Sequence, residues 1–134
     1  MSEHSNAARL ADGLDRLAGG DLDGFLDLLS ADALVHVPGS NHIAGDYRGR
    51  NEIGDLVRCI LDMSQGSFRL EPMEILADDR YVMAFLHVTA EKDREPYDTV
   101  DATALKVDAE GRFSEYWWLP SDQAKFNTFW VSRT

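Results

Sequence analysis

Residues 36–49 read His36-Val-Pro-Gly-Ser-Asn-His-Ile-Ala-Gly-Asp-Tyr-Arg-Gly49, and the predicted fold is arranged around them. The stretch ends a short apolar run, residues 33–37, and leads into residues 51–63, where apolar positions recur with a helical period. Glycines and a proline interrupt it, and polar side chains lie between them. A small α+β domain often carries its chemistry on such a loop. In the simpler alternative, the glycines and proline only turn the chain and the polar groups face water.

The flanking sequence predicts one α+β domain over residues 1–134. Apolar residues at 7, 10, 14 and 17 indicate a first helix, and Asp21 is a plausible N-cap for a short second one. Period-two alternation predicts four further strands after the central helix, at residues 68–75, 81–91, 97–107 and 113–119, before a final helix that follows Pro120. The expected order is α-α-β-α-β-β-β-β-α, with helices covering one face of a curved antiparallel sheet.

Composition and charge exclude several classes of function. The chain has 24 acidic and 13 basic residues, a formal net charge of -11, which disfavours binding to nucleic acid or anionic membranes. No signal peptide opens the sequence, no apolar run is long enough to span a membrane, and Cys59 is the single cysteine, so we expect a cytoplasmic protein. Metal-ligand spacing and nucleotide-binding glycine patterns are both missing, so we expect neither a metal nor a cofactor.

Four segments resemble the SnoaL-like branch of the nuclear-transport-factor-2-like (ketosteroid isomerase-like) superfamily. They are Asp21-Leu-Asp-Gly-Phe25, Ala33-Leu-Val-His-Val-Pro-Gly39, Gly45-Asp-Tyr-Arg-Gly49 and Gly111-Arg-Phe-Ser-Glu-Tyr-Trp117. The resemblance spans about residues 7–130. It implies a cone-shaped sheet around an apolar pocket, a small apolar ligand, and a homodimer formed through the outer face of the sheet.

Alternation along the strands predicts which side chains point into the cone. In the strand at 97–107 we place Thr99, Asp101, Thr103, Leu105 and Val107 inside. In the strand at 113–119 we place Phe113, Glu115, Trp117 and Leu119 inside, and Tyr116 and Trp118 on the other face. In the strand at 33–37 alternation favours Val35 and Val37 inside, but the resemblance favours His36 at the pocket mouth, and we follow the resemblance.

Three residues are the candidate catalytic groups. His36 titrates near neutral pH and could act as a general base, although a structural histidine bonded to the loop is the alternative. Asp101 could act as an acid or base and could fix the tautomer of His36 through a hydrogen bond. Tyr47 could donate a hydrogen bond to a substrate oxygen, or could only anchor the loop. Residues predicted to contact the substrate are Trp117, Glu115, Thr103, Leu105, Asn41 and Phe129.

The sequence departs from the known enzymes of the superfamily. Val37 stands where isomerase-like members carry an acid before the proline, and no tyrosine precedes Tyr47. We therefore expect a cofactor-independent isomerase, cyclase or hydrolase that acts by acid-base chemistry on an apolar metabolite, such as a polyketide or an epoxide or carbonyl compound. The alternative is a non-catalytic binding or assembly module of the same fold.

Overall fold

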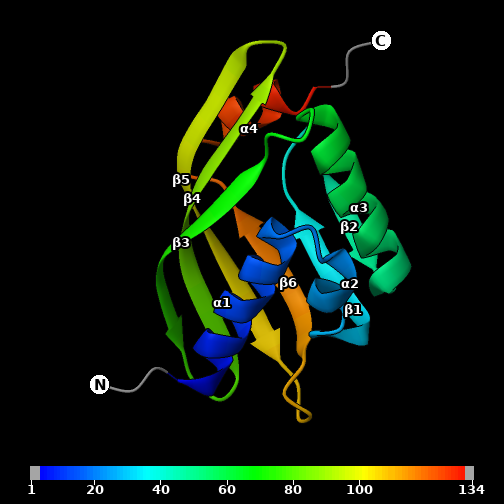
Figure 1. The fold of residues 1–134 in the computed structure, drawn as a ribbon, viewed down its shortest axis with the longest axis vertical. Coiled ribbons are helices and arrows are strands. Elements are labelled where there is room, and N and C mark those ends of the chain that lie inside the picture. The colour runs from blue at the N-terminus through cyan, green and yellow to red at the C-terminus, as the bar shows by residue number, and fades with distance from the viewer. Residues whose placement is uncertain (1–3, 132–134) are drawn as a thin grey trace.

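The computed structural model describes residues 4–131 and shows one mixed sheet with helices on its concave face (Figure 1). The elements are α1 (Ser5–Ala18), α2 (Leu22–Leu26), β1 (Leu29–Val37), β2 (Gly45–Arg48), α3 (Gly49–Met63), β3 (Arg69–Ala77), β4 (Tyr81–Lys92), β5 (Glu95–Val107), β6 (Phe113–Leu119) and α4 (Gln123–Phe129). The sheet has the strand order β2-β1-β6-β5-β4-β3. The predicted α+β architecture with a curved sheet is confirmed.

Two features of the sheet differ from the prediction. The strand β2 lies inside the loop at 36–49 and pairs with β1, and four residues interrupted by glycines give too weak a strand pattern to be recognised. The strands β1 and β6 pair in parallel, whereas all other neighbours are antiparallel. This parallel contact brings the loop at 36–49 beside the last strand, although the two segments are far apart in the sequence.

Local signals explain where the main helices begin and end. The side chain of His4 accepts a hydrogen bond from the amide of Asn6 and caps α1, and Gly20 with φ +85° follows its end. The helix α3 buries Ile53, Leu56 and Ile60 at helical spacing. Both helices lie across the same face of the sheet in Figure 1.

The core lies between the sheet and these helices, and α4 closes one end. Phe126, Phe129 and Trp130 are buried there against Tyr97 and Trp118. Alternating residues of β4 and β5 are buried on the inner face, as predicted for Asp101, Thr103 and Leu105. No helix among residues 4–131 combines the length and the apolar character that a membrane span requires.

A β-bulge corrects the predicted orientation of β6. Val107 pairs with Phe113, but Lys106 pairs with Glu115, so Ser114 is an extra residue in β6. A shift of one residue exchanges the two faces of a strand. Glu115, Trp117 and Leu119 therefore face outward, which contradicts the prediction, and Tyr116 and Trp118 face inward.

Candidate functional site: an apolar cavity

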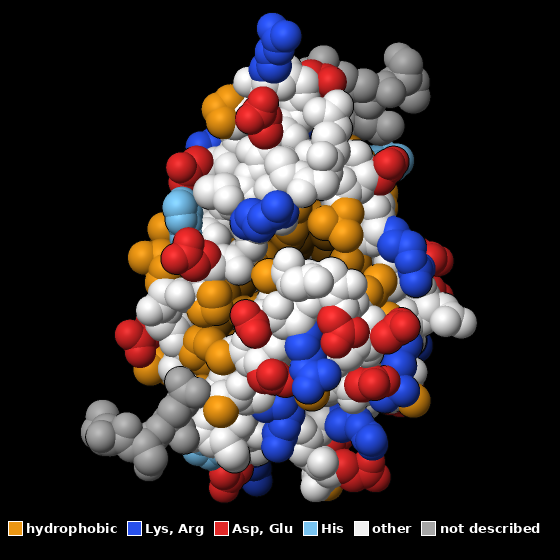
Figure 2. All heavy atoms as spheres, viewed as in Figure 1, with side chains coloured by type: hydrophobic (Ala, Val, Ile, Leu, Met, Phe, Trp, Pro, Cys, Tyr) orange, Lys and Arg blue, Asp and Glu red, His pale blue; other side chains and the backbone are white. Residues whose placement is uncertain are grey.

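A cavity of about 100 Å³ lies between the inner face of the sheet and the helices α1, α2 and α3. Figure 2 shows a hollow lined by hydrophobic side chains near the middle of the molecular surface in view, and charged side chains surround it. The lining residues are Leu14, Leu17, Ala18, Phe25, Leu29, Val35, Ile53, Leu56, Val57, Ile60, Leu61, Phe68, Arg69, Leu70, Leu86, Tyr116 and Trp118. The wall is therefore almost entirely aliphatic and aromatic.

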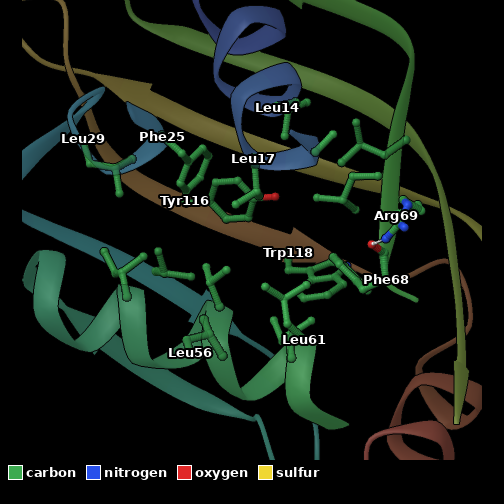
Figure 3. Close-up of a pocket in the computed structure, with 17 residues that line it drawn as sticks. Leu14, Leu17, Phe25, Leu29, Leu56, Leu61, Phe68, Arg69, Tyr116 and Trp118 are labelled. Carbon is green, nitrogen blue, oxygen red and sulfur yellow. Dashed lines mark hydrogen bonds between the residues drawn. The ribbon is translucent and has the colours of Figure 1, made fainter. Parts of the chain in front are cut away.

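Tyr116 brings a hydroxyl group into this apolar wall. Its ring lies between Phe25 and Leu17, and its oxygen points into the cavity (Figure 3). Burial raises the pKa of the Tyr116 phenol, the nearby hydroxyl of Thr103 acts in the opposite direction, and the charge of Asp101 raises the pKa further. At neutral pH the phenol is protonated, so it can both donate and accept a hydrogen bond.

Trp118 turns its polar atom away from the cavity. Its Nε1 donates to Asp101 Oδ2 over 3.1 Å, so the indole presents apolar surface to the ligand space. Asp101 also accepts hydrogen bonds from Thr99 Oγ1 at 3.0 Å, Tyr97 Oη at 3.3 Å, and the amide and hydroxyl of Ser121 at 3.1 and 3.4 Å. Only 1% of Asp101 is exposed. This carboxylate joins β5, β6 and the turn before α4.

His36 lies on the outer face of the sheet, so its predicted position at the pocket mouth is wrong. Alternation along β1 buries Val35 and Val37, as the sequence pattern alone indicated. His36 Nδ1 lies 2.8 Å from Asp46 Oδ1 and Nε2 lies 2.6 Å from Glu115 Oε2. The expected hydrogen bond to Asp101 does not form among the described residues, because the two side chains point to opposite faces.

The outward group of His36, Asp46, Glu115 and Trp117 forms what we call the histidine clamp. The imidazole stacks on Trp117 with ring centroids 5.5 Å apart, and it connects β2 to β6 across β1. Only the doubly protonated ring donates to both carboxylates. Burial lowers the pKa of His36, but the hydrogen bonds to Glu115 and Asp46 outweigh it, so the pKa lies above the ordinary value. Lys106 and Arg48 are the cationic residues on the neighbouring strands of this face.

The other predicted site residues support the fold around the cavity. Tyr47 donates to Ile43 O over 2.7 Å and anchors the loop. Asn41 donates to Asn127 Oδ1 over 2.9 Å and joins the loop to α4.

Three predicted contact residues are buried but lie behind the cavity wall. Thr103 donates to Trp117 O over 3.0 Å, Leu105 is 1% exposed, and Phe129 packs against Tyr97. Within residues 4–131, only Tyr116 and Arg69 bring polar groups to the lining, and Trp118 adds the apolar surface of its indole. Sequence reasoning missed all three residues. The pairing of two aromatic residues on one face of β6 was the signal that could have identified Tyr116 and Trp118.

A metal centre is not evident in the part of the chain that the structure describes. No group of three His, Cys, Asp or Glu side chains converges there.

The geometry defines a class of protein: a curved-sheet α+β domain with an apolar cavity under its helices. The SnoaL-like domain matches residues 10–116, and the chain belongs to this family. The predicted resemblance is thus confirmed. A search of curated proteins gives no match.

Solved structures share the fold over nearly the whole chain. Bal32a from a soil-derived mobile gene cassette is 25% identical, with a TM-score of 0.88, covering 93% of this chain and 95% of Bal32a. TerC co-crystallized with polyporic acid is 16% identical, with a TM-score of 0.81 and coverage of 92% and 96%. SalBIII, an epoxide hydrolase/cyclase-like enzyme with a role in pyran ring formation in the polyether salinomycin, is 13% identical, with a TM-score of 0.73 and coverage of 87% and 90%.

Replacing Asp101 tests its role as a buried structural acceptor. Asp101→Ala leaves the buried donors of Trp118 and Tyr97 without their acceptor, so we expect the free energy of unfolding to fall by about 3 kcal/mol. Urea denaturation measures this change. The control is Asp98→Ala on the same strand, whose exposed carboxylate bonds to His87 and whose loss should cost under about 1 kcal/mol. Equal losses in the two variants would contradict the assignment.

The histidine clamp predicts a pH-dependent contribution to stability. The raised pKa of folded His36 means that the clamp contributes fully below the unfolded pKa of about 6.5 and is lost as pH rises through the folded pKa. We expect His36→Gln to reduce the free energy of unfolding by about 1 kcal/mol at pH 6, with a smaller difference at pH 9.

Urea denaturation across this pH range, together with NMR titration of the His36 ring, tests the clamp. His42→Gln is the control, because His42 lies on the same loop with an exposed side chain outside the clamp. A difference between wild type and His36→Gln that stays constant from pH 6 to pH 9 would show that His36 does not act as an imidazolium.

Proposed function

We propose that this protein binds a small, largely apolar molecule in the cavity and that Tyr116 forms a hydrogen bond with an oxygen of that molecule. The observation that carries the proposal is the inward hydroxyl of Tyr116 in a wall that is apolar apart from Arg69 at its border. Pockets of this composition use burial for affinity and few polar groups for orientation. A carbonyl or hydroxyl compound fits this chemistry.

The cavity volume limits the ligand. About 100 Å³ is of the same order as an engineered apolar cavity of about 150 Å³ that binds benzene. One ring or a short branched chain therefore fits without rearrangement. A larger ligand requires lining side chains to move, and one of them, Leu61, is 39% exposed.

The geometry supports ligand binding better than it supports acid-base catalysis by His36 and Asp101, the two residues predicted to carry it. His36 faces outward, and Asp101 is held behind Trp118 by five hydrogen bonds. The second candidate function is electrophilic catalysis by Tyr116, whose neutral phenol could stabilise charge that develops on a carbonyl or epoxide oxygen. The similar fold of an epoxide hydrolase/cyclase-like enzyme favours this candidate.

A second copy of the chain is the partner that we propose for the outer face of the sheet. The pairing registers place Leu76, Met83, Ala104 and Trp117 in one row across four strands. A neighbouring row runs through Phe85, Ala102 and Leu119. Leu76, Met83, Phe85 and Leu119 are each 40–55% exposed, so four large apolar side chains of these two rows lie partly in solvent.

Charge favours self-association through this patch over other faces. Each copy carries a formal net charge of -11, so two copies repel one another over most of their surface. The central positions of both rows carry no acidic side chain, and Glu74 and Asp46 lie at the row ends. A twofold axis through the patch buries the same apolar residues on both copies.

Replacing the hydroxyl of Tyr116 tests the binding proposal. We expect Tyr116→Phe to weaken the binding of phenol about fivefold, the value of one net hydrogen bond, and to leave benzene binding within about twofold. Calorimetric titration measures both affinities. Tyr47→Phe is the matched control, because its hydroxyl bonds to Ile43 outside the cavity. Failure of the wild-type protein to bind either probe would overturn the proposal.

The proposed dimer is tested at the centre of the apolar patch. Phe85→Glu places a charge in the contact on both copies, so we expect it to weaken dimerisation by at least about tenfold. Size-exclusion chromatography with light scattering measures the mass over a dilution series. The control is Val131→Glu, which adds the same charge at an exposed site outside the two rows. A wild-type protein that is monomeric at every concentration tested would contradict this proposal.

A further inference from the structure

Seventeen of the described residues, 4–131, line the cavity, and Arg69 is the one charged residue among them. It is the first residue of β3, an edge strand of the sheet, and follows Phe68. Figure 3 shows Arg69 beside Phe68 at the border of the cavity, away from Tyr116. The cavity thus has two polar points: the hydroxyl of Tyr116 inside and a guanidinium group at its rim.

Hydrogen bonds hold this guanidinium group in place and leave part of it available. Arg69 Nη1 donates to Gly66 O over 3.0 Å and to Phe68 O over 2.8 Å, both in the turn between α3 and β3. Nε and Nη2 have no partner within the described part of the chain. An arginine carries five N–H donors, so most of its donors remain free for a ligand.

Arg69 lacks a carboxylate partner, in contrast to three other surface arginines of the described residues. Arg16 pairs with Asp12, Arg58 with Asp55, and Arg112 with Glu110. Across residues 4–131, no acidic side chain forms an ion pair with Arg69, although acidic residues outnumber basic ones by 24 to 13 in the sequence. A cation that is left unpaired beside an apolar cavity can bind an anionic group of the ligand.

We infer that the ligand is an amphipathic monocarboxylate whose apolar body fills the cavity and whose carboxylate binds Arg69 at the rim. This inference rests on the proposed binding function and adds the chemical class of the ligand. A planar carboxylate matches the fork of a guanidinium group in a bidentate pair. A single negative charge also suits a protein with a formal net charge of -11 better than a doubly charged phosphate ester does.

The test compares two probes that share a ring and differ in charge. Phenylacetate and 2-phenylethanol are titrated calorimetrically at pH 7 into the wild-type protein, Arg69→Gln and the control Arg80→Gln. Arg80 is exposed in the turn before β4 and does not line the cavity, so its replacement makes the same change in net charge elsewhere. Unfolding midpoints confirm that the variants remain folded.

We expect Arg69→Gln to weaken phenylacetate binding about tenfold and to change 2-phenylethanol binding by less than about twofold, with Arg80→Gln like wild type. Arg69→Lys keeps the charge but lacks the fork, and should recover only part of the affinity. Equal phenylacetate affinity in wild type and Arg69→Gln, with 2-phenylethanol still bound, overturns the role of Arg69 and leaves the binding function standing. Binding of neither probe by the wild-type protein overturns both.

Discussion

The extra residue Ser114 in β6 is the constraint on which the candidate site depends. Without this bulge, the pairing of β6 with β5 would turn Tyr116 outward and Glu115 inward. The cavity would then contain a carboxylate, and the hydroxyl of Tyr116 would face water. The same shift supplies Glu115 and Trp117 to His36 on the outer face. One local irregularity therefore determines the chemistry of both faces of the sheet.

Asp101 makes this arrangement stable at the end of the sheet that α4 covers. Its carboxylate accepts the indole N–H of Trp118 and thereby fixes which part of that ring faces the cavity. It also bonds to Ser121 in the turn that leads into α4, so the position of β6 and the position of α4 depend on the same group. A buried charge is tolerated only when hydrogen bonds compensate the lost hydration, and five bonds do so here. Asp101 is therefore better explained as a structural residue that holds the cavity wall in place than as a catalytic acid or base.

Much of the fold was predictable because long periodic segments dominate it. The 3-4 spacing of Ile53, Leu56 and Ile60 and the alternation that buries Asp101 and Leu105 both identify the inner face correctly. The orientation of β6 was not predictable from alternation, since a bulge at Ser114 leaves no fixed residue pattern. For β1, alternation correctly predicted that Val35 and Val37 are buried. The wrong placement of His36 at the pocket mouth came from the position of a catalytic group in related enzymes. A family resemblance shows the fold but does not fix which groups a given member retains.

The separation of ionisable groups between the two faces limits what the cavity can do. Among the described residues, His36 of the histidine clamp faces outward together with its carboxylate partners Asp46 and Glu115. The inner wall instead carries the phenol of Tyr116, and burial favours the neutral form of this phenol. A neutral phenol recognises an oxygen without taking up or releasing a proton near pH 7. The apolar wall removes water and so strengthens that single hydrogen bond. The bulge therefore places the one oriented hydroxyl inside the cavity, where selection depends on shape, apolar surface and that hydroxyl, while Arg69 lies at the rim. Proton transfer inside the cavity would have to use groups that the ligand itself brings.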